Sequence, residues 1–199
     1  SNNREEIDRA ELSINLALQG KKVVVVSSGD PGVFAMASAI FEVVDKKNIS
    51  IDDLSIVVLP GITALLAASA RLGAPIGHDF CVINLSDNLK SWDILKSRVI
   101  AAAKADFVIA FYNPRSKSRK NQLSEIYDVL RKNCKSDRIV IYANSISTES
   151  EAVFETTLSE ADASSVSMKT LVIIGSSRTK KIRNTGYIYT PRYSGVEKN

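Results

Sequence analysis

The first part of the chain alternates between helical patterns and short apolar runs. Across residues 4–19 apolar side chains recur every three or four positions, which is typical of an amphipathic helix. Lys22–Ser27 and Leu54–Leu59 are short runs of β-branched and other apolar residues, typical of strands that are buried on both faces. Helices are expected after each run, at 33–46 and 62–72. This order predicts an α/β unit with a mainly parallel sheet.

The pattern restarts after residues 73–79, a stretch rich in glycine, alanine and proline that we interpret as a linker between domains. We therefore expect two α/β domains with mainly parallel sheets, residues 1–78 and 79–199. In the second domain the pattern predicts strands at 80–85, 107–111, 138–143, 171–174 and 187–190, and helices at 92–103 and 122–132.

Composition narrows the class of protein. Of 199 residues, 45% are apolar and 24% are charged, a globular balance that excludes a disordered or fibrous chain. The net charge of +4 is too small an excess to suggest nucleic acid as a partner. The apolar runs are too short to span a membrane, and two distant cysteines with one histidine offer no metal-binding pattern. We expect a cytoplasmic protein that binds no metal.

Polar loops that follow the predicted strands are the candidate sites, because ligands of open parallel sheets bind beyond the carboxyl ends of the strands. The first loop is 27–34, SSGDPGVF, where glycines permit close approach to a ligand and Asp30 could hold a ribose hydroxyl. A tight turn with Asp30 capping the next helix is the simpler alternative. The second loop is 59–64, LPGITA, where Thr63 and a helix N-terminus offer a hydroxyl and amides; an ordinary N-cap explains it equally.

Two further loops carry cations. Residues 115–120 hold four cations directly after a strand, which suits a ligand with carboxylates or phosphates, although a solvated basic loop is the alternative. Residues 175–181, GSSRTKK, could receive a nucleobase or the acidic rim of a substrate, with capping as the alternative. The only histidine, His78, is interpreted as structural or as a substrate contact, while Trp92 and Cys81 are expected in the core.

Taken in order, these segments are more specific than any one of them. SSGDPGVF, LPGITALLAASARLGAPIGHDFCVINLSD, FYNPRSKSR, GSSRT and YTPR closely resemble the tetrapyrrole methylases of cobalamin biosynthesis, and the similarity runs over essentially all of residues 4–193. The GAPIGHDF and YNPRSK segments resemble the branch that methylates carbon 17 of precorrin-3B or its cobalt-containing counterpart, with contraction of the ring. Other members share mainly the GDP and PG-x-T/S motifs.

The resemblance implies two α/β domains of the tetrapyrrole methylase type, with S-adenosylmethionine held between them, a precorrin-type tetrapyrrole substrate and a homodimer. No nucleic acid and no membrane is implied. Four cations, Arg115, Lys117, Arg119 and Arg178, are our candidates for the rim that meets the carboxylates of the substrate. The implied cofactor contacts are Ser28, Gly29, Asp30, Val33, Thr63, Ala64, Tyr112, Asn113, Ala143 and Ser176.

One segment of the family pattern has no counterpart here. Members of the family begin with a strand and a G-x-G-P-G loop, whereas this chain opens on a helix. We therefore expect an N-terminally truncated chain whose first domain lacks that strand and which binds the cofactor weakly. Another S-adenosylmethionine-dependent methylase of this fold, or a nucleotide-binding module without catalysis, are the alternative interpretations.

Overall fold

The computed structural model describes residues 5–116 and 120–193, and divides into two compact units, Ser1–Thr63 and Ala64–Asn199. We describe each unit by itself. The division lies before the predicted boundary at residue 78, because residues 64–78 fold with the second unit. Among the described residues, none of the helices is long and apolar enough to cross a membrane.

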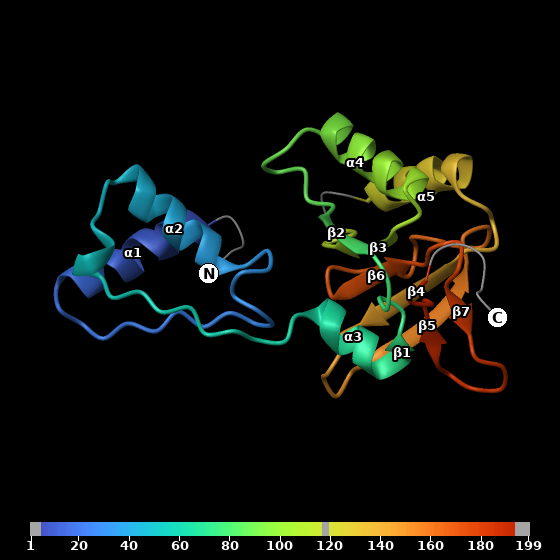
Figure 1. Cartoon of the computed structure of the whole chain (residues 1–199). Helices are drawn as coiled ribbons and strands as arrows, with labels where there is room; N and C mark the ends of the chain where they lie inside the picture. Colours follow the sequence, from blue (N-terminus) through green and yellow to red (C-terminus); the bar gives the residue numbers. More distant parts are fainter. Residues whose placement is uncertain (1–4, 117–119, 194–199) are drawn as a thin grey trace. The chain divides into compact units, whose positions relative to one another are not determined.

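The first unit is built on two helices, α1 (Glu6–Leu18) and α2 (Met36–Lys46), followed by a short 3-10 helix, η1 (Ile51–Asp53) (Figure 1). Helix α1 lies where the apolar spacing predicts it, and α2 begins at Met36, three residues after the predicted start of the helix at 33–46. Acidic residues in the first turn of α1 and Lys46 in the last turn of α2 complement the helix dipoles. Their facing stripes form a small core: Ala10, Ile14, Met36, Ala39, Val43 and Val44.

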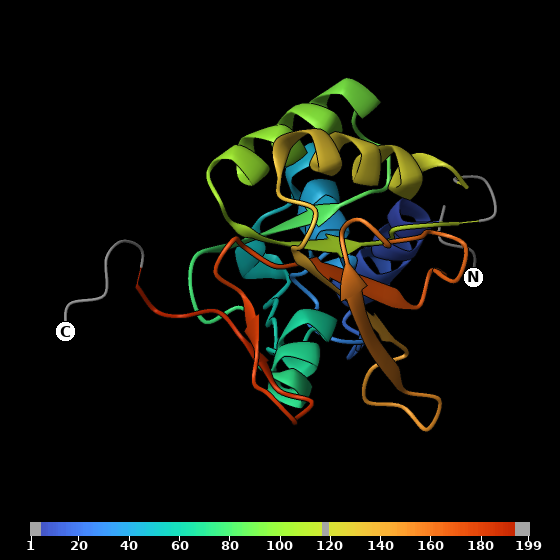
Figure 2. The ribbon, with the colours of Figure 1, turned by 90° about the vertical axis from the view of Figure 1, so that its right-hand side faces the viewer.

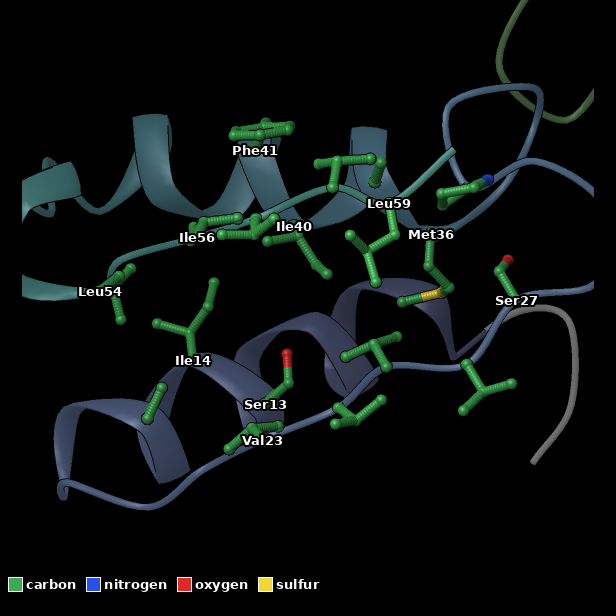
Figure 3. Close-up of a pocket in the computed structure, with 18 of the residues that line it drawn as sticks. Ser13, Ile14, Val23, Ser27, Met36, Ile40, Phe41, Leu54, Ile56 and Leu59 are labelled. Carbon is green, nitrogen blue, oxygen red and sulfur yellow. The ribbon is translucent and has the colours of Figure 1, made fainter. Parts of the chain in front are cut away.

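Lys22–Ser27 and Leu54–Leu59, the two Val-rich runs of this unit, are extended but are not strands of a sheet. The prediction of buried parallel strands is therefore wrong here. The two runs line an apolar groove of about 730 Å³, into which Ile14 and Ile40 point from the two helices (Figure 3). Alternate side chains are the most exposed: Val24 and Val26 by 83% and 88%, Val57 and Leu59 by 75% and 74%, against 38% for Val25 and 45% for Val58. The runs are apolar on both faces, but the helices cover only one.

The second unit contains a five-stranded sheet in the order β2-β3-β6-β4-β5. Only β2 and β3 run parallel; β6 is antiparallel to both β3 and β4, and β5 is antiparallel to β4. The α/β class is as predicted, but the expectation of mainly parallel sheets is wrong for this unit. The strands are β2 (Phe80–Asn84), β3 (Val108–Tyr112), β4 (Ile139–Asn144), β5 (Ala152–Thr157) and β6 (Thr170–Ile174).

Helices cover both faces of this sheet (Figures 1 and 2). On one face lie α4 (Trp92–Lys104) and α5 (Gln122–Asn133), with Leu95 and Leu130 in the core that they form with the sheet. On the other face lies α3 (Ala64–Leu72), which buries Leu65, Ala68 and Leu72. Because both faces are covered, β6 is buried along its whole length, which explains the apolar run from Leu171 to Ile174.

The predicted linker belongs to the second unit. Gly73–Ala74 forms strand β1, which pairs with β8 (Ile188–Tyr189), and β8 also pairs with β7 (Lys180–Lys181). A Cβ atom on Gly77 would lie 2.8 Å from the carbonyl oxygen of Thr190, so glycine is needed for close approach of two backbones. The glycines that suggested a flexible linker therefore serve this packing.

Candidate functional site

In the first unit Asp30 joins the two loops that the sequence singled out. Its carboxylate accepts hydrogen bonds from the backbone N–H groups of Gly32 at 2.8 Å and Gly61 at 3.0 Å. These donors favour the charged form and hold the pKa of Asp30 below its usual value of 3.8. Helix α2 begins at Met36 with Ala35 as its N-cap, so Asp30 does not cap it.

Glycines allow the two loops to touch. A Cβ atom on Gly61 would lie 2.0 Å from the carbonyl oxygen of Gly29, and Gly29 has a φ of +75°. A Cβ atom on Gly29 would in turn lie 3.5 Å from Cα of Thr63. The structure thus brings Gly29, Asp30 and Thr63 together, and the N–H of Val33 donates to the carbonyl oxygen of Asp30 at 3.2 Å. Ser28 is exposed beside them.

In the second unit Tyr112 reaches the start of α3. The backbone N–H of Leu65 donates to the Tyr112 hydroxyl at 2.9 Å, so the last residue of β3 contacts the first turn of α3. Ala64 is the first residue of that helix. The predicted contacts Ala64 and Tyr112 therefore lie close together, and one of the amides expected to face a ligand is already taken by Tyr112.

Asn113 follows Tyr112 in the left-handed region, with a φ of 50°. Its side-chain Nδ2 donates to Oδ1 of Asn84, the last residue of the neighbouring strand β2, at 3.1 Å. The sequence analysis did not single out Asn84. The signal that could have found Asn84 is its place in the sequence, as a polar residue near the end of the strand predicted at 80–85.

Ala143 lies near the end of β4, at the same edge of the sheet, with its side chain buried. The next residue, Asn144, pairs with Thr170 at the start of β6, and Thr170 Oγ1 donates to Asn144 Oδ1 at 3.1 Å. Because β6 is antiparallel to β3 and β4, its first residue lies at the edge where those strands end. Thr170 is a second polar residue of this edge that sequence reasoning missed.

Ser176 and Arg178 lie at the opposite edge of the sheet, which corrects their predicted grouping with Tyr112. Ile174, the last residue of β6, pairs with Ile109 and Val140 near the starts of their strands. Ser176 is buried in a turn of its own, where its N–H donates to Thr179 Oγ1 at 2.9 Å and its hydroxyl accepts from the N–H of Arg178. The prediction assumed that β6 runs parallel to β3. Because β6 is antiparallel, the loop that follows it lies at the edge where β3 and β4 begin.

Of the predicted rim cations, Arg115 is anchored. Its Nη1 donates to the carbonyl oxygens of Ala163 at 2.8 Å and Ser164 at 2.7 Å. The guanidinium of Arg178 stacks over the ring of Tyr193, 5.4 Å from its centroid. Lys117 and Arg119 lie outside the described residues.

The remaining singled-out residues have structural contacts. Nδ1 of His78 accepts from the N–H of Asp79 at 2.7 Å, and Trp92 Nε1 donates to Glu125 Oε2 at 2.8 Å while the indole packs against the core. Cys81 is half-buried against the same core. Within residues 5–116 and 120–193, no group of three or more histidine, cysteine, aspartate or glutamate side chains could hold a metal ion.

Polar groups lie at one edge of a helix-covered sheet, and glycine-bearing loops surround a carboxylate in the other unit. Both features are typical of α/β proteins that bind small molecules at loop and strand ends. Comparison with known proteins gives the family. The model of the tetrapyrrole (corrin/porphyrin) methylases matches residues 1–162. The chain therefore belongs to this family of methyltransferases.

Two curated relatives give the similarity in detail. The chain is 47% identical over 196 residues to a precorrin-3B C(17)-methyltransferase of Sinorhizobium sp, covering 97% of this chain and 77% of the relative. It is 40% identical over 187 residues to a probable cobalt-factor III C(17)-methyltransferase of Salmonella typhimurium, covering 94% of this chain and 76% of the relative.

Solved structures agree on the fold. The crystal structure of the methyltransferase CobJ matches with a TM-score of 0.89 at 46% identity, covering 96% of this chain and 79% of that one. A uroporphyrin-III C-methyltransferase of Thermus thermophilus, solved with S-adenosylhomocysteine, matches with a TM-score of 0.59 at 18% identity, covering 84% of this chain and 72% of that one.

Proposed function

We propose that the chain transfers the methyl group of S-adenosylmethionine to carbon 17 of precorrin-3B or its cobalt-containing counterpart, with contraction of the ring, in cobalamin biosynthesis. The observation that carries the proposal is the 47% identity to a precorrin-3B C(17)-methyltransferase over nearly the whole chain. The GAPIGHDF and YNPRSK segments, which resemble the same branch, support it.

The cofactor supplies an activated methyl group on a sulfonium. On transfer of that methyl to a nucleophilic carbon of the substrate, S-adenosylhomocysteine would be the leaving group. The residues of the chain then have mainly to hold the reactants in line, a task of positioning. The proposal assigns cofactor contacts to Ser28, Gly29, Asp30, Val33, Thr63, Ala64, Tyr112, Asn113 and Ala143, and contacts with the substrate carboxylates to Arg115, Lys117 and Arg119.

The donors and acceptors of the described residues fit such a cofactor. Gly29 and Gly61 let the two loops of the first unit touch, so that the Asp30 carboxylate and Thr63 are held in one place. At the sheet edge, the Asn113 amide presents a neutral acceptor of the kind that an adenine amino group matches.

The direct test is methyl transfer from S-adenosylmethionine to precorrin-3B, followed by mass spectrometry of the product. We expect the product to gain one methyl group and S-adenosylhomocysteine to appear in equal amount. No transfer to either form of the substrate, with transfer to another tetrapyrrole, would assign the chain to a different branch of the family.

Binding provides a second measurement. Saturation with S-adenosylhomocysteine at a hundred times its dissociation constant should stabilise the fold by about 2.7 kcal/mol. Asp30→Ala should weaken this binding by about tenfold, because the loop that Asp30 organises loses its link to Gly61. Asp52→Ala, an exposed carboxylate of the same unit, is the matched control. A lower melting temperature with unchanged affinity would make Asp30 purely structural.

A further inference from the structure

The second unit has a basic pocket at the edge of the sheet where β3 and β4 begin. Helix α4 ends at Lys104 and β3 begins at Val108, while α5 ends at Asn133 and β4 begins at Ile139. Because both connections are short, the C-terminal ends of the two helices lie at this edge. Together with Ser177, in the loop after β6, they line a pocket of about 620 Å³. The polar strand ends of the candidate functional site lie at the opposite edge of the sheet.

Cations dominate the lining of this pocket. Four of its side chains are basic, namely Lys104, Lys132, Lys135 and Arg138, and one, Asp106, is acidic. Asp106 accepts a hydrogen bond from Arg138 Nη2, so these two charges compensate each other. The three lysines are exposed, and within residues 5–116 and 120–193 none of them forms an ion pair.

The helix ends account for only part of this charge. Lys104 and Lys132 lie in the last turns of α4 and α5, where a cation complements the helix dipole. Each helix C-terminus carries about half a unit of negative charge, so the two ends together offset roughly one lysine. Lys135 lies beyond α5, in a turn where its carbonyl oxygen accepts from the N–H of Arg138 at 3.4 Å. The pocket therefore keeps about two positive charges without a partner.

One buried donor in the lining has no acceptor. Arg138 is 7% exposed, and its Nε has no hydrogen-bond partner in the part of the chain that the structure describes. Its Nη2 donates to Asp106, whose other oxygen accepts from the hydroxyl of Ser177. Its Nη1 reaches the carbonyl oxygen of Gly175 only at 3.4 Å. A buried donor that lacks a protein acceptor is costly, and in folded proteins its partner is commonly a bound water or ion.

We propose that this pocket binds a phosphate group, which accepts from the buried Arg138 guanidinium and is surrounded by Lys104, Lys132 and Lys135. Guanidinium N–H groups match the oxygens of phosphate, and ammonium groups neutralise its negative charges. A water at Nε would satisfy that donor but would leave the excess positive charge uncompensated. The volume lies within the range of about 300–1,000 Å³ that is typical of small-molecule sites, so a small organic molecule can carry the phosphate. The inference goes beyond the proposed function and does not depend on it.

Isothermal titration calorimetry of the whole chain with inorganic phosphate, at low ionic strength, tests the proposal. We expect saturable binding with a dissociation constant of about 1 mM or lower. The double variant Lys132→Gln, Lys135→Gln should weaken binding by about tenfold or more, because it removes two charge-assisted contacts. The matched control is Lys169→Gln, Lys180→Gln, which replaces two exposed lysines of the same unit outside the pocket and should leave the affinity unchanged.

The role of Arg138 is tested without a substitution, because its replacement can unfold the chain. Nitrogen-15 NMR observes the Nε–H group of a buried arginine directly, and the signal is assigned from the backbone resonances of Arg138. We expect phosphate to shift this signal, whereas acetate at the same ionic strength leaves it in place. A signal that phosphate does not change would show that a water, and no anion, accepts from Nε, and would overturn the proposal for Arg138.

The remaining outcomes identify the ligand or refute the site. Tighter binding of glycerol 3-phosphate than of inorganic phosphate would assign the pocket to an organic phosphate monoester, and equal or weaker binding to the free anion. Absence of saturable phosphate binding, equal affinity for acetate, or unchanged affinity in Lys132→Gln, Lys135→Gln overturns the proposal. Each of these results leaves the proposed methyl transfer to its own test.

Discussion

At the residue scale, burial sets the chemistry of the cysteines. Cys81 is half-buried in β2 and packs against the main core of the second unit, where its thiol is partly withdrawn from water. Desolvation disfavours the thiolate and raises the pKa of Cys81 to about 11. It also raises the pKa of Cys134. Both side chains are therefore protonated near neutral pH, consistent with the prediction that Cys81 is an inert core residue.

Alkylation by iodoacetamide tests this directly. At pH 8 we expect Cys81 to react on the order of a hundredfold more slowly than an ordinary thiol with a pKa of about 8.5, because so little thiolate is present. The rate should rise as the pH approaches 11. Peptide mapping by mass spectrometry measures each site, with the chain in urea as the control. Rapid labelling of folded protein at pH 8 would contradict the burial of Cys81.

The same shift has a consequence for stability. The folded thiol keeps its proton between the unfolded value of 9.0 and the folded value of about 11, whereas the unfolded thiol loses it. The contribution of the buried Cys81 thiol to the free energy of unfolding is therefore fully present below pH 9. It declines as the pH rises from 9 to about 11, because unfolding then releases a proton.

At the scale of elements, the ion pair between Asp106 and Arg138 links three loops, at the edge of the sheet where β3 and β4 begin. Asp106, in the turn between α4 and β3, accepts from Arg138 Nη2 at 2.5 Å and from the N–H and hydroxyl of Ser177 at 2.9 and 2.6 Å. Arg138 precedes β4 and is only 7% exposed, and its Nε has no hydrogen-bond partner. The carboxylate thus compensates a buried guanidinium and fixes the loop that follows β6.

Asp106→Asn should destabilise the fold by about 1–3 kcal/mol, because the buried Arg138 loses its charged partner. Asparagine keeps the shape and tolerates the φ of 60° at this position, so backbone strain does not confuse the result. Urea denaturation followed by circular dichroism measures the change. Asp137→Asn, one residue before Arg138 and exposed, is the control. Equal midpoints for the two variants would show that the ion pair contributes nothing.

At the scale of the whole molecule, the exposed faces of the two Val-rich runs bear on assembly. Val24, Val26, Val57 and Leu59 together expose more apolar surface than scattered single residues do. Their backbone groups form no sheet with any described strand. A second copy of the chain that covered these residues would remove apolar surface from water and stabilise the assembly.

We accordingly predict a homodimer. Light scattering at micromolar concentration should give about twice the 21.7 kDa mass of one chain. The double variant Val24→Lys, Val26→Lys should shift the mass to that of the monomer. The control is Leu89→Lys, a single leucine that is 94% exposed in the second unit. A monomer mass for the wild-type chain would refute the prediction.

Local pattern was enough to predict most elements. The periodic spacing in 4–19 and 122–132 predicted α1 and α5 within a residue or two, and the apolar run at 171–174 predicted β6. Strand β5 was missed, because the polar sequence around Phe154 lacks a continuous apolar run. The loops at Gly29–Pro31 and Gly61 were each singled out from the sequence as candidate sites, and only the family resemblance assigned both to one cofactor.

The sequence by itself therefore determined where helices and strands form and which loops carry polar groups, because these follow from spacing along the chain. Only the tertiary structure decided strand direction and pairing, since an apolar run reads the same in a parallel and an antiparallel sheet. The reversal of β6 moved Ser176 and Arg178 to the far edge and brought Thr170 beside Asn144. The orientation of Asn113 depends on Asn84, a residue distant in sequence whose hydrogen bond exists only once β2 and β3 pair.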